Sequence, residues 1–187
     1  PDGYTMLLGT AGNLAINPSL YRNVPFDVAR DLAPVARIVS VDMMLTVNRD
    51  VPAKTVADLV ALARAQPGRL NYGSTGVGGI PHLTAELFAR TAGIDIRHVP
   101  YKGGGPALAD LIAGHVQVYV QSVVQGAGAV KDGRVRALAM LGPQRSAILP
   151  DVPTMGETLP GYAATNWYGL MVPARTQAAI REQLHAG

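Results

Sequence analysis

The spacing of hydrophobic side chains changes along the chain, and each change predicts a different element. After Thr55, apolar residues recur every three or four positions, which predicts a helix capped by Thr55 and stopped by Pro67 and Gly68. The recurring positions are Val56, Leu59, Val60 and Ala63. A β-prone run from Val35 to Val47, interrupted near Asp42, predicts extended chain instead.

Strand, loop and helix alternate through the middle of the chain. The predicted strands are residues 70–73, 96–100, 116–120 and 135–141, and the predicted helices are residues 82–92, 106–113 and 122–131. Alternation at this spacing predicts an α/β fold, in which a parallel or mixed sheet is covered by helices on both faces.

Two extended segments, residues 45–48 and 166–171, flank this alternating block. If both segments cross between lobes, the central block is one complete lobe and the two ends belong to another. The predicted division is residues 1–48 as part of lobe I, 49–164 as lobe II, and 165–187 as the return to lobe I.

The composition is that of a folded globular protein without a nucleic-acid-binding surface. Of the 187 residues, 48% are hydrophobic and 16% are charged, a balance too apolar for a disordered chain. The 16 Lys and Arg residues exceed the 13 Asp and Glu residues by +3, and they are spread singly along the chain. No basic cluster is present that could follow a phosphate backbone, so we expect no nucleic-acid partner.

Several other classes are excluded or left open by simple absences in the sequence. The lack of Cys excludes disulfides, a thiolate metal site and a cysteine nucleophile. No apolar run reaches the roughly 18 to 20 residues that span a bilayer. Residues 1–4 predict a turn rather than the start of a signal peptide, and there is no initiating Met, so we expect the chain to be a piece of something longer.

A glycine- and hydroxyl-rich loop at residues 74–79 is the most informative local feature. It joins a predicted strand to a helix N-terminus, where free backbone N–H groups and the helix dipole favour an anion. Its glycines do not follow a nucleotide-binding pattern, so we expect a carboxylate or another small anion. The candidate ligand-binding residues here are Ser74, Thr75, Gly76, Gly78 and Gly79. The alternative is that the glycines only make a tight turn.

Three further loops follow predicted strands, at the edge of an α/β sheet where ligands usually bind. The loop at residues 9–13 contributes Thr10, Ala11 and Asn13 as candidates. Lys102 could balance the charge of an acid, or it could be an ordinary solvated lysine. Gln121 and Ser122 offer an amide and a hydroxyl, although Ser122 could equally cap the next helix.

Candidates for catalysis are weak. The four histidines, His82, His98, His115 and His185, lack metal-ligand spacing, and each is expected to be a surface or helix-start residue. Ser74 does not lie in a G-x-S-x-G elbow, and no base is found near a nucleophile. We therefore predict no catalytic residue, no metal and no cofactor.

The ordered set of motifs resembles one known family over essentially the whole chain. The motifs are Pro1–Leu8 (PDGYTMLL), Ala15–Tyr21 (AINPSLY), Leu70–Gly76 (LNYGSTG) with His82-Leu83, Val99–Leu108 (VPYKGGGPAL), Leu149–Thr154 (LPDVPT) and Trp167–Leu170 (WYGL). They are similar to the Bug family, the periplasmic solute receptors associated with tripartite tricarboxylate transporters.

This resemblance implies a two-lobed, Venus-flytrap binding protein with mostly parallel sheets flanked by helices and an incomplete first lobe. It implies a periplasmic monomer that closes on a small organic acid, without cofactor or catalysis, and passes it to the membrane components of the transporter. By motif, the acid would be contacted from the first lobe by Thr10, Ala11 and Asn13, and from the second by Ser74, Thr75, Gly76, Gly78 and Gly79. Family members also carry an N-terminal strand and a ligand loop that this chain lacks.

The chain departs from the family at two positions near the expected site. The family often has Phe-Asp where this chain has Val120-Gln121, and Ser is common where Gly79 stands. These changes remove a charge and a hydroxyl, which weakens any inference about the particular acid. Two other functions share such architectures and stay open at this point: the effector-binding domain of a transcription regulator, and an α/β hydrolase or transferase.

Overall fold

The computed structural model describes residues 2–186 and divides into two compact units. Unit 1 runs to Val41 and resumes at Asn166, and unit 2 comprises Asp42–Thr165. The first boundary falls before residues 43–48, which the sequence analysis assigned to lobe I. It falls there because those residues pair with strands of unit 2.

Unit 2 is built on a mixed five-stranded sheet. Its strands, in spatial order, are β5 (Arg97–Pro100), β4 (Asn71–Ser74), β6 (Val118–Ser122), β3 (Met43–Asn48) and β7 (Val135–Met140). β4 runs parallel to β5 and β6, whereas β3 runs antiparallel to β6 and β7. Four strands therefore share one direction and β3 alone opposes them, which confirms the predicted α/β class with a mainly parallel sheet.

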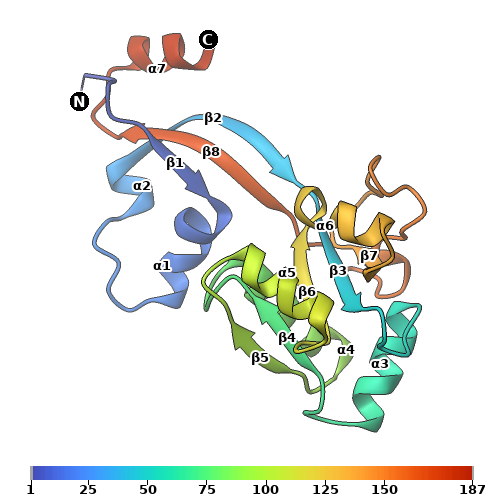
Figure 1. The fold of residues 1–187 in the computed structure, drawn as a ribbon. Coiled ribbons are helices and arrows are strands. Elements are labelled where there is room, and N and C mark those ends of the chain that lie inside the picture. The colour runs from blue at the N-terminus through green and yellow to red at the C-terminus, as the bar shows by residue number, and fades with distance from the viewer. Residues whose placement is uncertain (1, 187) are drawn as a thin grey trace. The chain divides into compact units, whose positions relative to one another are not determined.

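Helices cover both faces of this sheet (Figure 1). The hydroxyl of Tyr72 on β4 donates to Glu86 of α4 (Ile80–Ala92), so α4 lies on that face. Tyr119 on β6 packs instead against Ala107 and Leu111 of α5 (Gly104–Ala113). Tyr72 pairs with Val118, and neighbouring residues of a strand point to opposite faces, so α4 and α5 lie on opposite sides.

The remaining helices of unit 2 begin at polar caps. Helix α3 (Val56–Ala65) starts after Thr55, whose side chain accepts from the N–H of Asp58 while the Asp58 carboxylate bonds back to Thr55. This is the predicted cap. Helix α6 (Val123–Lys131) starts after Ser122, and a short 3-10 turn, η2 (Met155–Glu157), lies in the loop-rich segment before unit 1 resumes.

Unit 1 holds a three-stranded sheet in the order β1 (Leu7–Thr10), β8 (Asn166–Pro173), β2 (Leu32–Val41). Both pairings are antiparallel, so the mostly parallel arrangement expected from the resemblance does not extend to this sheet. The reason is connectivity: β2 leads the chain out of unit 1 and β8 leads it back, so the two neighbours run in opposite directions.

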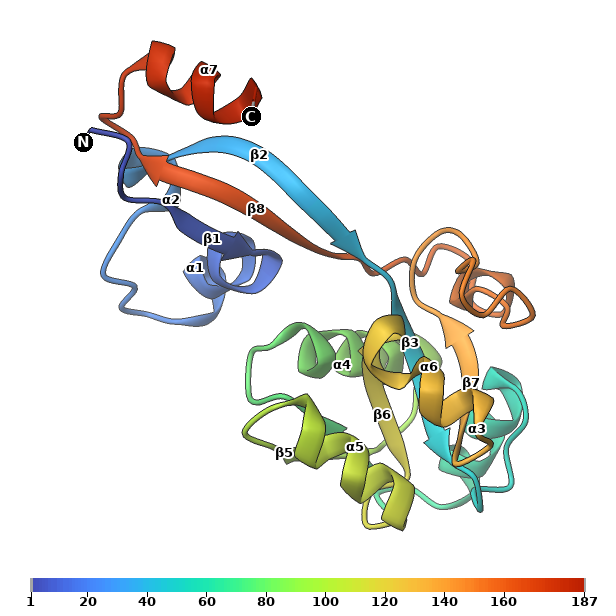
Figure 2. The ribbon, with the colours of Figure 1, turned by 45° about the horizontal axis from the view of Figure 1, so that its top comes forward.

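Short helices cover the faces of the unit 1 sheet (Figure 2). They are η1 (Gly12–Ile16), α1 (Asn17–Leu20), α2 (Val28–Asp31) and α7 (Ala178–Ala186). Leu184 of α7 packs with Val35 and Val172 on one face. On the other face, Met171 and Leu14 line a common cavity. Across residues 2–186, none of the helices has the length and apolar character needed to cross a membrane.

Candidate functional site

The loop between β4 and α4 has the backbone geometry that its glycines suggested. Gly76 has a φ of +121° and Gly78 a φ of +79°, a region that side-chain-bearing residues rarely adopt. Gly79 precedes the first helical residue, and no side chain caps the helix there. The loop therefore connects a strand to a helix whose first N–H groups are not covered by a capping side chain.

Several amides at this helix start are available to a ligand. Within the described part of the chain, the N–H groups of Val77, Ile80 and His82 make no hydrogen bond. Val77 is exposed, whereas Ile80 is buried and His82 half-buried. Free N–H groups at the positive end of a 13-residue helix are suited to an anion.

Ser74 holds the loop together rather than reaching outward. Its Oγ accepts from the N–H of Gly76 at 3.1 Å, donates to the Gly76 carbonyl at 3.1 Å, and lies 2.6 Å from Nε2 of His98. The residue is 0% exposed. Its hydroxyl is therefore already engaged, whereas the neighbouring Thr75 is exposed.

His82 lies in the first turn of α4, as predicted for a helix-start residue, and meets the half-buried His98 beneath this loop, a contact that was not predicted. Their ring centroids are 4.1 Å apart, and the His98 ring also stacks on Tyr72 at 4.9 Å. Nδ1 of His82 accepts from the N–H of Gly78 at 3.1 Å. The sequence did not reveal this contact because the two histidines come together only through the pairing of β4 with β5 and the packing of α4.

Burial and charge set the protonation of this cluster. Burial, reinforced by the nearby His82, lowers the pKa of His98 below its usual 6.5, while the Glu86 carboxylate opposes that shift. Burial and the bond to Glu86 raise the pKa of Tyr72. His98 is therefore a neutral ring at pH 7.

The contact between Ser74 and His98 is a hydroxyl beside an imidazole, a pairing that the sequence did not reveal. It does not form a nucleophile and base for an external substrate, because Ser74 is 0% exposed and its hydroxyl is bonded within its own loop. The pair stabilises the loop conformation.

Gln121 and Ser122 have structural roles in unit 2. Gln121 is 0% exposed, and its Nε2 donates to Oγ1 of Thr46 at 3.0 Å. Helix α6 passes so close above it that a Cβ on Gly126 would lie 2.6 Å from Cδ of Gln121. The hydroxyl of Ser122 accepts from the N–H of Gln125 at 3.3 Å, which is the helix-capping alternative.

Lys102 is exposed in the loop that leads into α5, as expected of a solvated lysine. The next element begins earlier than predicted, at Gly104 rather than Pro106. Beside it, the hydroxyl of Tyr101 donates to Asp110 at 2.7 Å. Among residues 2–186, no hydrogen bond or ion pair directs the Lys102 side chain toward a bound acid.

In unit 1, the predicted loop at residues 9–13 is instead a strand end followed directly by a helical turn. The Asn13 carboxamide oxygen accepts from the N–H of Thr10 at 2.6 Å and from its hydroxyl at 3.1 Å. The Thr10 hydroxyl in turn accepts from the N–H of Asn13 at 3.3 Å. These bonds occupy the Thr10 hydroxyl and the Asn13 carboxamide oxygen, so the Asn13 carboxamide nitrogen and backbone groups near the buried Ala11 remain for a ligand.

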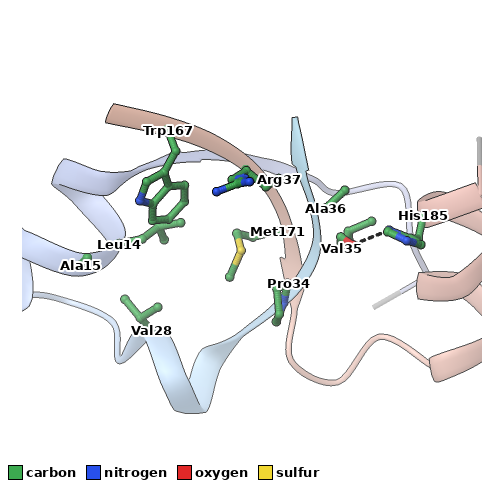
Figure 3. Close-up of a pocket in the computed structure, with 11 residues that line it drawn as sticks. Leu14, Ala15, Val28, Pro34, Val35, Ala36, Arg37, Trp167, Met171 and His185 are labelled. Atoms are coloured by element: carbon green, nitrogen blue, oxygen red, sulfur yellow. Dashed lines mark hydrogen bonds between the residues drawn. The ribbon is translucent and has the colours of Figure 1, made fainter. Parts of the chain in front are cut away.

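Unit 1 also contains a cavity of about 600 Å³ with a mainly apolar lining (Figure 3). Leu14, Val28, Trp167 and Met171 surround it, and Arg37 is the charged side chain that lies against them. His185 bonds to the carbonyl of Val35 at 2.9 Å. The lining of this cavity is mainly apolar, as in a packing surface, whereas the loop of unit 2 offers polar amide groups.

Among residues 2–186, no group of three or more His, Asp or Glu side chains is arranged to hold a metal ion.

The whole chain, residues 1–187, matches the family described as "Tripartite tricarboxylate transporter family receptor". The chain belongs to this family. Its members are receptors for solutes and not enzymes, which agrees with the absence of catalytic candidates in the sequence analysis.

Similar curated proteins support membership of the receptor family. Protein BugT of Bordetella pertussis is 35% identical over 181 residues, covering 96% of this chain and 56% of BugT. A protein encoded in the tcbD-tcbE intergenic region of Pseudomonas sp. strain P51 is 35% identical over 187 residues, covering 99% of this chain and 55% of the relative. The chain thus spans little more than half the length of these relatives.

Solved structures of the receptor family share the fold. Rpa4515 of R. palustris, determined with adipate, superposes with a TM-score of 0.90 at 36% identity, covering 98% of this chain and 62% of that one. MatC from Rhodopseudomonas palustris, with bound malate, gives a TM-score of 0.88 at 29% identity, covering 100% and 64%. The predicted resemblance and fold class are confirmed by these matches.

Proposed function

We propose that this protein is the extracytoplasmic receptor of a tripartite tricarboxylate transporter, and that it binds a small mono- or dicarboxylate and delivers it to the membrane components. The observation that carries the proposal is the open amide cluster at the start of α4, in a chain that belongs to the receptor family. The acids named for Rpa4515 and MatC, adipate and malate, have the chemistry that such a cluster accepts.

Charge-assisted hydrogen bonds supply the affinity. Each bond from a backbone N–H to a carboxylate contributes about 1.5 to 3 kcal/mol. Bonds from Val77, Ile80 and His82 would give about 4.5 to 9 kcal/mol before the losses of binding entropy are subtracted. With contacts to the rest of the ligand, a micromolar dissociation constant, about −8 kcal/mol, is the expected outcome.

The proposal assigns the ligand contacts mainly to backbone groups. In the loop of unit 2 these are Thr75, Gly76, Gly78 and Gly79 together with the helix start. For unit 1 taken by itself, we propose that the turn after β1 offers the N–H groups of Ala11 and Gly12 and the amide nitrogen of Asn13, whose amide oxygen is bonded to Thr10. No metal, cofactor or covalent step is required, and we propose that the receptor acts as a monomer in the periplasm.

Calorimetric titration with C4 to C6 mono- and dicarboxylates, including adipate and malate, tests the proposal. We expect at least one acid to bind at micromolar concentration, and chromatography of the mixture to return the acid unchanged. Absence of binding across the panel by a folded protein would reject the proposed ligand class. Time-dependent loss of the acid would favour an enzyme instead.

A further inference from the structure

The rings of His82 and His98, whose centroids are 4.1 Å apart, lie next to the amide cluster and touch its loop at two separate points. His82 bonds to the N–H of Gly78, and His98 contacts the hydroxyl of Ser74. These contacts fall on the two sides of Gly76, the residue with the most unusual backbone angle in the loop. The conformation of the loop is therefore held from beneath at both ends.

Counting donors and acceptors assigns a proton to Nε2 of His98. A serine hydroxyl offers one donor and two acceptor lone pairs. The Ser74 hydroxyl donates to the Gly76 carbonyl and accepts from the Gly76 N–H, which leaves one lone pair for His98. Nε2 of His98 therefore donates to Ser74, and the neutral ring carries its proton on Nε2.

The same accounting for His82 also places the proton on Nε2, although its contact with the loop is made by Nδ1. Nδ1 of His82 accepts from the Gly78 N–H, so it must be unprotonated and the neutral ring carries its proton on Nε2. A proton added to Nδ1 would face the Gly78 N–H and remove this bond. The His82 contact is thus made only by the neutral ring.

We propose that His82 and His98 are positioning residues for the acid: packed against each other, they hold the Ser74–Gly79 loop in the conformation that presents its amides. The inference rests on the proposed function for its ligand and on the hydrogen bonds of the loop for its mechanism. His82 acts through Gly78, and His98 acts through Ser74.

The groups facing His98 explain why its ring is neutral. The titratable and charged groups that face His98 are Tyr72 on β4 and both His82 and Glu86 on α4. Two positive rings with centroids 4.1 Å apart would repel each other. The position beside His82 therefore favours the neutral form of His98.

Substitutions that keep or remove the bonding atom separate positioning from simple packing. His82→Asn places an amide oxygen near the place of Nδ1, whereas His82→Leu fills similar space without an acceptor. His98→Gln places an amide nitrogen near the place of Nε2, whereas His98→Leu removes the donor. His115, an exposed histidine with 71% of its side chain accessible, supplies the matched control His115→Leu.

The variants are titrated with adipate and with malate at pH 7.5, and their melting temperatures are recorded. We expect the two leucine variants of the pair to bind roughly 3- to 10-fold more weakly at pH 7.5, the effect of one hydrogen bond. We expect His82→Asn and His98→Gln to stay within about 2-fold of the parent, and His115→Leu to match it. Equal losses in the conservative and leucine variants would overturn the proposal in favour of packing.

Nuclear magnetic resonance gives a second test that needs no ligand. Exchange of the Gly78 N–H with solvent should accelerate in His82→Leu but not in His82→Asn, and the His82 ring of the parent should show an unprotonated Nδ1. A protected Gly78 in His82→Leu, or a proton on Nδ1, would overturn the proposal. If the parent binds neither acid, the proposed ligand class fails while the exchange data still decide the role of the histidines.

Discussion

Replacing Gly76 tests whether the loop conformation itself makes the binding site. Gly76 has a φ of +121°, and a Cβ added there would meet only the Tyr101 carbonyl, at 3.9 Å. The space is thus adequate, and the penalty lies in the backbone angle. Holding a non-glycine residue in such a region costs about 1 to 3 kcal/mol. Since the loop can relax when no acid is bound, Gly76→Val should lose that amount in binding, roughly 5- to 150-fold.

Calorimetry with the best acid of the panel measures this loss, and circular dichroism checks that the fold is kept. Gly76→Ala should lose nearly as much as Gly76→Val, because the angle rather than the volume is responsible. The matched control is Gly128→Ala in α6, where no heavy atom lies within 4 Å of the added Cβ. It should bind normally and gain up to about 1 kcal/mol of stability. Affinity of Gly76→Val within twofold of the parent would refute the reasoning.

Three further substitutions and conditions have defined outcomes. Gly79→Ser should stabilise α4 by a few tenths of a kcal/mol, because Ser is at least as good an N-cap as Gly. The added Cβ would lie 3.2 Å from Oγ1 of Thr75, so the Thr75 side chain must shift slightly. A fall in melting temperature would show that this shift costs more than the cap gains. The folded state should lose stability as pH falls below about 6.5, since the lowered pKa of His98 keeps that ring neutral in the fold while it gains a proton in the unfolded chain. Urea titrations at several pH values check this, and the slope should diminish in His98→Gln. Gln121→Ala should cost about 2 to 3 kcal/mol of stability through the lost bond to Thr46 and the cavity, with acid affinity unchanged, as urea titration and calorimetry would show.

Local signals in the sequence predicted the elements that depend on local chemistry. The cap at Thr55 and the glycine loop at residues 74–79 lie where they were predicted, because a capping side chain and a positive φ are satisfied by near neighbours in the chain. The break in the β-prone run at Asp42 is likewise local, and it separates β2 from β3.

Features that depend on distant partners could not be predicted. Gln121 follows a strand and therefore looked like a ligand residue, but helix α6 covers it at Gly126. His82 and His98 meet because β5 pairs with β4 while α4 folds back over the same face. A single sequence contains no record of which strand a given strand will pair with.

The position of β3 in its sheet has a consequence for the order of folding during synthesis. β3 is the first strand of unit 2 to be made, its six residues are all buried, and both its neighbours come much later. Thr46 and its partner Tyr119 are 73 residues apart. At about 5 to 20 residues per second, the ribosome needs about 4 to 15 s to complete that partner. During this interval the apolar strand has two unpaired edges, which are prone to aggregate. We therefore expect a nascent chain of this receptor to bind chaperones that delay aggregation.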